Sequence, residues 1–413
     1  MLVKVLLALT VITITARVMG WVFARVRQPA VIGEVVGGIL LGPSLLGRIA
    51  PDTAALVLPP DAASILSVIA QLGVILYMFL VGLELDLAVL KTRARTTVAI
   101  SNAAIIVPFA LGVMLAWTIY SAYAPAGVAF LPFALFLGVS MSITAFPVLA
   151  RILSDHRLQR TPMGVMALTC AAIGDATAWC LLAFVVGVTE ATTGRAVMTI
   201  ALTAVYVALM LTIGRTVMSR AITRLDSSIA VGEQSLAIVL VAVLLSAVAT
   251  EFIGVHAIFG AFLLGAIIPH RSATARHVRE KIEHVVRVLL LPAFFAFTGL
   301  RTQIGLVQGV NDWLMCLLII AIATAGKFGG ATLAARFSGL DWRDSAALGI
   351  LMNTRGLVEL IVLNIGLDLG VLTPRLFTML VVMALVTTMM TSPILMALLR
   401  KRPWRELNST TAA

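Results

Sequence analysis

Residues 140–147 read SMSITAFP, a group of hydroxyl side chains followed by a proline inside a long apolar run. Pro147 lacks an N–H, so it leaves the backbone carbonyl one turn earlier without its helical partner, and its ring crowds that carbonyl. In lipid, a freed backbone group needs another partner or a wet cavity. Ser140, Ser142 and Thr144 carry hydroxyls at the same level. We therefore expect this helix to unwind inside the membrane, with a simple proline kink as the alternative.

A second interruption lies near the other end of the chain, where residues 352–359 read MNTRGLVE. Polar or flexible residues in a spanning helix are costly unless they face protein or water. Four of them follow one another here: Asn353, Thr354, Arg355 and Gly356. Arg355 and Glu359 are spaced i, i+4, so they can pair along one helix face. We expect this pair to have a structural role, in which it neutralises charge beside an unwound segment.

The composition of the whole chain is that of a polytopic membrane protein. Of 413 residues, 61% are hydrophobic and 12% are charged, whereas an average soluble domain has about 25% charged residues. This composition excludes a soluble domain and a disordered chain. Cys170, Cys180 and Cys316 all lie in apolar runs, which excludes a disulfide scaffold.

Thirteen apolar runs predict helices that cross the bilayer, for which about 20 apolar residues are needed. They lie at approximately 2–24, 30–46, 62–83, 97–119, 129–152, 162–188, 196–214, 234–251, 255–269, 288–303, 312–335, 345–367 and 376–399. The second and ninth runs are short and rich in glycine. We therefore expect an all-α membrane protein of about 13 transmembrane helices, followed by a short cytoplasmic tail at 401–413.

Basic residues are distributed unevenly between alternate loops. One set of loops includes the clusters Lys91–Arg95, Arg151–Arg160 and Arg271–Arg287. The other set, with the extreme N-terminus, holds only Lys4, Arg48, Arg195, Arg301 and Arg375. The positive-inside rule places the richer loops and the C-terminus in the cytoplasm and the N-terminus outside a plasma or inner membrane. The same rule accounts for the net charge of +11 without a nucleic-acid partner.

Three local patterns recur in the same order, seven runs apart. GILLGP at 38–43 resembles GAFLLG at 260–265, FLVGLE at 79–84 resembles FTGLR at 297–301, and the interruption at 140–147 matches that at 352–359. Because seven is odd, the two copies face opposite ways, and inverted repeats with matching helix breaks are typical of secondary transporters. Close packing of glycine-rich helices is the alternative.

The recurrence suggests how the chain is divided. We assign residues 1–400 to one transmembrane domain, with repeat one at about 1–188, a linker helix at about 196–214 and repeat two at about 234–400. If both interrupted helices unwind and cross, two positive and two negative half-helix ends meet near the membrane midplane, where one charged residue can balance them.

Asp175 lies in AAIGDATAW, about twelve residues from either end of its predicted span. An unpaired carboxylate near the bilayer centre is costly. It can bind a proton or a cation instead, and these two options exclude one another at a single site. This exclusion is the chemistry that a cation/proton antiporter needs. The alternative is a structural aspartate that is hydrogen-bonded to threonine or to Trp179.

Two further charges are candidates for supporting roles. Lys327 lies deep in a span between glycines, and it can pair with Asp175, cap a half-helix C-terminus or titrate itself. Snorkelling to the cytoplasmic side is the alternative. Glu84, at the cytoplasmic end of its span, either caps the membrane edge or attracts cations to an inward funnel.

Six segments, in family order over nearly the whole chain, closely resemble the monovalent cation:proton antiporter-2 family. This family includes the plant cation/H+ exchangers and bacterial potassium efflux antiporters. The matching segments are FLVGLELD at 79–86, SITAFPVLARIL at 142–153, GDATAWCLL at 174–182, HAIFGAFLLG at 256–265, LLPAFFAFTGL at 290–300 and LMNTRGLVELIVLNIG at 351–366.

The resemblance implies a sodium/proton antiporter fold of thirteen helices, a homodimer and an elevator-like cycle of alternating access. It implies that Asp175 is the ion-binding aspartate, that Thr144 belongs to the first unwound segment, and that Lys327 and Glu84 match the family's basic and acidic positions. The family often has Asp or Asn immediately before the aspartate, whereas this chain has Gly174. With one carboxylate, we expect one proton per cation, which is electroneutral.

The sequence therefore predicts an antiporter that exchanges K+, or else Na+, for H+, with Asp175 binding proton and cation in turn. Thr144 and backbone carbonyls would complete the cation shell. No cofactor and no resident metal are expected, and no nucleophile–base pair indicates an enzyme. An uncoupled cation channel and a non-transporting membrane sensor are the alternatives.

Overall fold

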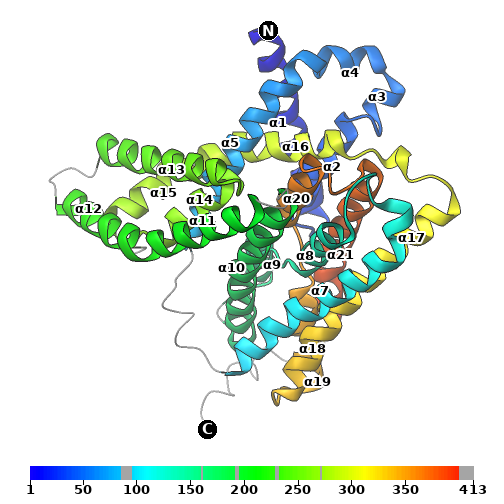
Figure 1. Cartoon of the computed structure of the whole chain (residues 1–413). Helices are drawn as coiled ribbons and strands as arrows, with labels where there is room; N and C mark the ends of the chain where they lie inside the picture. The colour runs from blue at the N-terminus through cyan, green and yellow to red at the C-terminus, as the bar shows by residue number, and fades with distance from the viewer. Residues whose placement is uncertain (85–94, 160, 191–194, 228–231, 270–271, 400–413) are drawn as a thin grey trace. The chain divides into compact units, whose positions relative to one another are not determined.

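The computed structural model describes residues 1–84, 95–159, 161–190, 195–227, 232–269 and 272–399, and every regular element in these ranges is helical (Figure 1). Ten helices are long and apolar enough to cross a membrane, and a bent pair forms one further span. Two shorter apolar helices, Phe130–Ser142 and Ala257–Ile267, occupy the fifth and ninth predicted runs. Each of the thirteen predicted runs therefore contains a helix. The predicted tail at 401–413 lies outside the described residues.

The chain divides into two compact units. Unit 1 comprises Met1–Ile14, Ala50–Lys91 and Ala183–Phe297, and unit 2 comprises Thr15–Ile49, Thr92–Leu182 and Thr298–Ala413. Three helices belong partly to each unit: α1 (Leu2–Arg25), α10 (Pro162–Glu190) and α16 (Leu291–Arg301). The division does not test the boundaries of the two repeats, which stay a prediction.

Unit 1 is built around a glycine-rich helix pair. Its helices are α4 (Pro51–Val57), α5 (Pro60–Glu84), α11 (Arg195–Leu209), η1 (Met210–Gly214), α12 (Arg215–Ser227), α13 (Glu233–Ile253), α14 (Ala257–Ile267), α15 (Ala273–Val285) and η2 (Val286–Leu290). Helix α14 packs against both α5 and α13. The predicted linker at 196–214 is present as α11 and η1. The most apolar part of the span Ala201–Asp226 has no buried residue, as expected for a helix that faces lipid or a partner.

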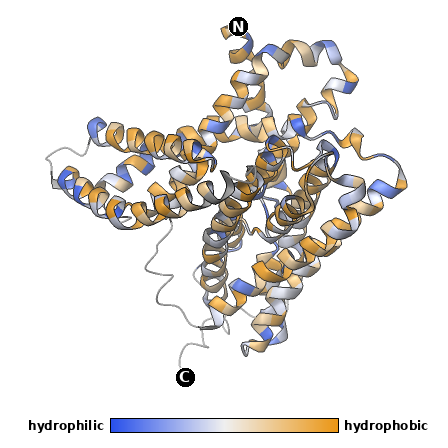
Figure 2. Ribbon diagram, viewed as in Figure 1, coloured by the Kyte–Doolittle hydropathy of each residue, from blue (hydrophilic) through white to orange (hydrophobic). Residues whose placement is uncertain are grey.

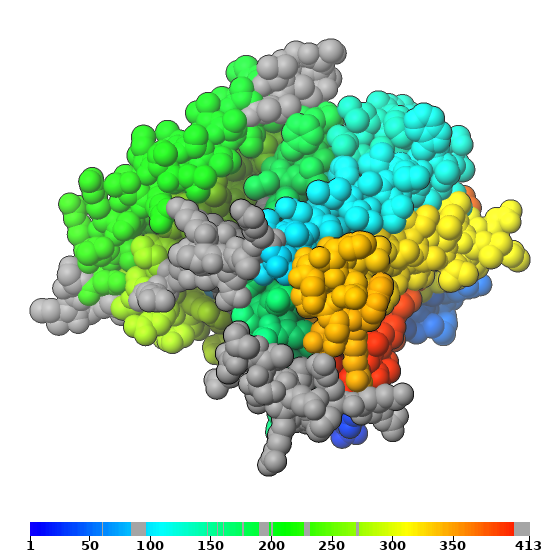
Figure 3. All heavy atoms as spheres, turned by 90° about the horizontal axis from the view of Figure 1, so that it is seen from below, coloured from blue at the N-terminus to red at the C-terminus, as the bar shows by residue number. Residues whose placement is uncertain are grey.

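Unit 2 contains both interrupted helices. Its helices are α2 (Ala30–Leu41), α3 (Leu46–Ile49), α7 (Arg95–Tyr123), α8 (Phe130–Ser142), α9 (Phe146–Asp155), η3 (Ile304–Leu306), α17 (Gly309–Thr324), η4 (Ala325–Gly329), α18 (Gly330–Phe337), α19 (Trp342–Met352), α20 (Leu357–Asp368) and α21 (Pro374–Leu399). Helix α18 packs against α7, and the two lie side by side in Figure 3.

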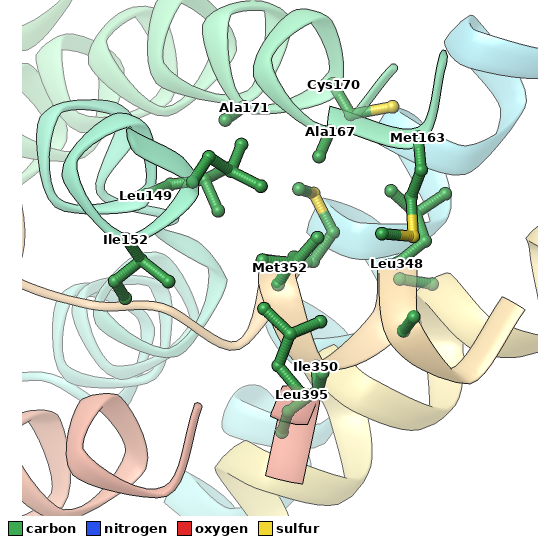
Figure 4. Close-up of a cluster of buried hydrophobic side chains, with 14 of the residues drawn as sticks. Leu149, Ile152, Met163, Ala167, Cys170, Ala171, Leu348, Ile350, Met352 and Leu395 are labelled. Atoms are coloured by element: carbon green, nitrogen blue, oxygen red, sulfur yellow. The ribbon is translucent and has the colours of Figure 1, made fainter. Parts of the chain in front are cut away.

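A buried hydrophobic cluster in unit 2 includes one half of each broken helix, α9 and α19. Leu149 and Ile152 of α9, Ala167 of α10, and Leu348 and Met352 of α19 belong to one buried cluster (Figure 4). Figure 2 shows hydrophobic residues along the lengths of the helices, and many of them, such as Leu245 and Leu317, are exposed on the outer faces. Such outer faces fit a protein whose solvent is lipid.

Glycine contacts occur at corresponding places in the two predicted repeats. In unit 1, a Cβ on Gly82 of α5 would overlap the Phe262 carbonyl of α14, and one on Gly265 would overlap Phe79. In unit 2, a Cβ on Gly299 of α16 would overlap the backbone of Gly38 in α2. The second helix of each predicted repeat thus packs against the third helix of the other, while the inverted relation of the repeats stays a prediction.

We expect the substitution Gly82→Val to destabilise the protein, because the added side chain must displace the backbone of α14. Overpacking of this kind costs about 1–3 kcal/mol. The measurement is the thermal unfolding midpoint of the purified protein. Gly305→Val is the matched control, since a Cβ at Gly305 meets no atom within 4 Å. Equal midpoints for the two variants would contradict the prediction.

Candidate ion-binding site

The two interrupted helices meet at their breaks. Helix α8 ends at Ser142 and α9 begins at Phe146, while α19 ends at Met352 and α20 begins at Leu357 after a bend of 45°. The Ala145 N–H donates a hydrogen bond to the Thr354 carbonyl at 3.0 Å, so one unwound segment is joined directly to the other. The predicted crossing of two broken helices is therefore present.

The local sequence explains where each break falls. Pro147 is the second residue of α9, a position where a missing N–H costs no helical hydrogen bond. The first break thus precedes the proline and comprises residues 143–145. At Gly356, an added Cβ would lie 2.6 Å from Val148 Cγ2, so α9 and the second break approach too closely for a side chain.

Two fully buried cations cap the C-terminal end of α8. Arg355 Nη1 donates to the Ser140 carbonyl and Nη2 donates to the Met141 carbonyl, each at 2.8 Å. Lys327 Nζ donates to the Ser142 carbonyl and, at 2.5 Å, to Thr144 Oγ1. A helix C-terminus carries partial negative charge, so both cations lie where the helix dipole favours them.

This arrangement bears on two of the predicted roles of Lys327 and on the snorkelling alternative. Its side chain is 0% exposed, so the snorkelling alternative is wrong. It caps a half-helix C-terminus, which is one of the three predicted roles. Within the described part of the chain, it forms no ion pair with Asp175. Lys327 lies in the π-helical turn η4, and such turns are frequent at functional sites.

The hydroxyl groups in the first break and in the last turn of α8 form different hydrogen bonds. Ser140 and Ser142 donate back to carbonyls of their own helix, those of Leu137 and Val139, each at 2.9 Å. Thr144 Oγ1 donates to the Met352 carbonyl at 3.2 Å and accepts from Lys327. Thr144 is therefore the hydroxyl that connects the two breaks, while the serines contribute their backbone carbonyls.

Asp175 lies in the middle of α10 with its side chain 3% exposed. Neither carboxylate oxygen forms a hydrogen bond of normal geometry with a described residue. The Phe146 N–H, at the positive end of α9, and the Lys327 ammonium act on this carboxylate electrostatically. Neither carboxylate oxygen therefore accepts the hydrogen bond from threonine or Trp179 that the structural alternative requires.

Glu359 completes a cluster of four buried charges. It lies in the first turn of α20, and its Oε1 accepts from Arg355 Nη1 at 2.9 Å, so the predicted i, i+4 ion pair is present. Acids in a first helical turn are favoured by the dipole. Two cations and two carboxylates, Lys327, Arg355, Asp175 and Glu359, are thus distributed over the half-helix ends with a formal sum of zero when all are ionised.

One polar residue of this region, Thr388, was not predicted from the sequence, whereas Asn353 and Thr354 were predicted as part of the second unwound segment. Thr388 of α21 accepts the Arg355 N–H at 2.9 Å, and its hydroxyl also lies 2.9 Å from the Arg355 carbonyl. Asn353 Oδ1 and Thr354 Oγ1 are buried and accept no hydrogen bond from a described residue. The run of Thr387, Thr388, Thr391 and Ser392 in an apolar helix was the available signal.

Two other sequence expectations concern the surroundings of the cluster. Glu84 is the last residue of α5, but its side chain lies outside the described part of the structure. Gly174 is buried beside Asp175, and a Cβ built on it meets no atom within 4 Å. The position where the family often has a second carboxylate is therefore unoccupied by neighbouring side chains.

The sequence as a whole matches one family model. Residues 12–401 match the model described as "Sodium/hydrogen exchanger, transmembrane". The chain belongs to the sodium/hydrogen exchanger family. It is also 43% identical over 395 residues to the Na(+)/H(+) antiporter NhaS4 of Synechocystis, covering 95% of this chain and 96% of that protein.

Other members of the exchanger family are longer than this chain. Cation/H(+) antiporter 17 of Arabidopsis thaliana is 40% identical, and the match covers 95% of this chain but 48% of that protein. K(+)/H(+) antiporter 1 of Saccharomyces cerevisiae is 34% identical over 90% of this chain and 44% of its own length. These relatives support the predicted monovalent cation:proton antiporter family, whose members are transporters and not enzymes.

A solved exchanger structure confirms the fold class. The sodium proton antiporter MjNhaP1 of Methanocaldococcus jannaschii superposes with a TM-score of 0.67, at 13% identity and over 95% of this chain and 97% of that one. The all-helical exchanger fold predicted from the sequence is therefore correct. At this identity the similarity concerns the fold alone.

Proposed function

We propose that this protein exchanges a monovalent cation, K+ with Na+ as the alternative, for H+, and that Asp175 binds the two in turn. The observation that carries the proposal is a buried carboxylate without a hydrogen-bond donor of normal geometry, placed at the N-terminal end of a half-helix. A bare carboxylate is costly in a dry interior, whereas a protonated or cation-bound one is not. Only the two loaded forms would then reorient.

The cation shell would be drawn from buried oxygen atoms, since hard cations prefer oxygen ligands. Asp175 supplies the charge, and Asn353 Oδ1 and Thr354 Oγ1 are acceptors that have no donor among the described residues. Thr144 Oγ1 is occupied by Lys327 in this state. It would therefore join the cation shell only after the ammonium has moved away.

Alternating access would use unit 2 as the moving body. All four buried charges and both breaks belong to this unit, so they can move together without separating. We propose an elevator-like cycle in a homodimer, within a plasma or inner membrane and with the C-terminus in the cytoplasm. The apolar part of the span Ala201–Asp226 in unit 1, which has no buried residue, and the distribution of Lys and Arg support these assignments.

The names of the relatives include Na(+)/H(+) and K(+)/H(+) antiporters, so the test must present both ions. Purified protein in liposomes with an internal pH-sensitive dye is given a proton gradient, and then K+ or Na+. We expect K+ to dissipate the gradient. Cation flux without a pH change would indicate the uncoupled channel, and cation binding without flux would indicate the sensor.

Adding a second carboxylate at Gly174 should change the charge that is moved in each cycle. The substitution Gly174→Asp meets no steric barrier at the Cβ, because no atom lies within 4 Å. With Asp175 alone, exchange of one proton for one cation is electroneutral, and an imposed membrane potential should not alter the rate. We expect Gly174→Asp to make the rate depend on potential. Gly174→Ala is the control, and strong dependence already in the wild type would contradict the prediction.

A further inference from the structure

A cavity of about 390 Å³ lies in unit 2, away from the buried charge cluster. It opens between the end of α1, the start of α2, the end of α9 and one turn of α21. Its lining residues are Ala24, Arg27, Gln28, Pro29, Ala30, Arg151, Ile152, His156 and Ser392. Among the described residues that line the cavity, the basic side chains are two arginines and one histidine, and none of these residues is a carboxylate.

The basic side chains that line the cavity suit an anionic ligand. Guanidinium groups present several N–H donors in a planar fork that suits phosphate oxygens. The positive end of α2 also lies at the cavity, since Pro29 and Ala30 line it and no side chain caps this helix. Uncapped N–H groups at a helix N-terminus add a further site for phosphate oxygens.

The backbone at Arg27 is held in a conformation that L-residues rarely adopt. Its φ is +58°, and the hydrogen bonds from Gln28 N to Phe23 O and from Arg27 N to Ala24 O close the end of α1 around it. Glycine is the usual residue at this position of a helix end. Arg27 occupies this position in spite of that preference, and its side chain is one of the cavity's cations.

Gln28 adds a buried acceptor to the cavity, which a ligand with a hydroxyl group can satisfy. Its Nε2 donates to the Met389 carbonyl at 3.2 Å, which fixes the amide. Its Oε1 is buried and accepts no hydrogen bond from a described residue. A ligand that combines a phosphate with a hydroxyl group could satisfy the arginines and this oxygen together.

We propose that this cavity binds a phosphate group, as carried by a glycerol phospholipid headgroup or by a soluble phosphate ester. The predicted cytoplasmic location of the loops that contain Arg27 and Arg151 makes either source accessible. Helix α9 runs from the first break to this cavity. The bound phosphate would therefore stabilise the cytoplasmic end of a half-helix whose other end faces Asp175.

The test measures the thermal unfolding midpoint of the full-length purified protein, so it does not depend on transport. Four probes are titrated separately: dioleoyl phosphatidylglycerol, dioleoyl phosphatidylcholine, glycerol 3-phosphate and inorganic phosphate. We expect phosphatidylglycerol to raise the midpoint more than phosphatidylcholine does. A rise with glycerol 3-phosphate as well would support the same site with a soluble ligand.

Two variants connect the response to the cavity. Arg27→Asn removes the charge while keeping a residue that tolerates positive φ, and Arg151→Gln removes the second guanidinium. We expect each to raise the half-maximal probe concentration about tenfold, the loss of one charged hydrogen bond. Arg220→Gln, an exposed arginine of α12 outside the cavity, should respond like the wild type. No shift with any probe, or equal shifts in all variants, would overturn the proposal.

Discussion

The substitution Asp175→Asn should reduce cation/proton exchange to the level of protein-free liposomes while the protein remains folded. Asparagine has nearly the same size, so the buried space around residue 175 stays filled. The asparagine amide carries no charge near neutral pH, so it neither takes up a proton nor supplies a negative charge to a cation. The measurement is the dye assay with K+ and Na+, in both directions of the proton gradient.

The stability of the same variant separates an ion-binding role from a structural one. A structural carboxylate accepts hydrogen bonds, and removing it leaves buried donors unpaired at a cost of about 1–3 kcal/mol. Asp175 has no hydrogen bond of normal geometry with a described residue. We therefore expect the thermal midpoint of Asp175→Asn to equal or exceed that of the wild type, since a buried carboxyl group without a hydrogen-bond donor of normal geometry is replaced by a neutral amide.

Asp52→Asn is the matched control, because Asp52 is an exposed residue of α4. It should leave both exchange and the midpoint unchanged. Full exchange by Asp175→Asn would exclude Asp175 as the ion-binding group. A fall in its midpoint together with loss of exchange would instead favour the structural aspartate.

The substitution Arg355→Met should destabilise the protein more than any other change considered. It removes the donors to the Ser140 and Met141 carbonyls and leaves Glu359 without its cation. All of these groups are fully buried. Breaking a buried ion pair by removing one partner costs about 3–5 kcal/mol. The measurement is unfolding of the purified protein by heat, with Arg48→Met as an exposed control.

A double variant tests where this cost originates. If the unpaired Glu359 carboxylate accounts for much of it, Arg355→Met combined with Glu359→Gln should be more stable than Arg355→Met alone. The remaining loss would then report the two uncapped carbonyls of α8. A double variant that is less stable than Arg355→Met alone would show that Glu359 stabilises the fold through contacts other than this ion pair.

Much of the fold could be predicted because the signals are local. Apolar runs predict the spans, and the segments at 140–147 and 352–359 place the two breaks within a few residues. The i, i+4 pair of Arg355 and Glu359 follows from helix geometry alone. The repeated glycine motifs also correspond to real helix contacts, at Gly82 with α14 and at Gly299 with α2.

The partners of the buried charges could not be predicted, because they join residues far apart in the chain. Lys327 donates to the carbonyl of Ser142, and Arg355 donates to that of Ser140. Backbone carbonyls are present at every residue, so the sequence does not indicate which of them a cation will cap. The sequence instead indicated the serine hydroxyls, because they lie close to the break in the chain, but they donate to carbonyls of their own helix.

The π-helical turn η4 has a consequence for the length of the helix around Lys327. Asp312, Cys316, Ile319 and Ala323 form the buried stripe of α17, and Ala331 and Ala335 continue it in α18. Successive residues of an α-helix are rotated by about 100°, and a wide turn accommodates one additional residue. Deleting a single residue here would restore regular geometry but rotate either Lys327 or α18 away from the interior. The number of residues in this turn is therefore as constrained as the identity of the lysine it contains.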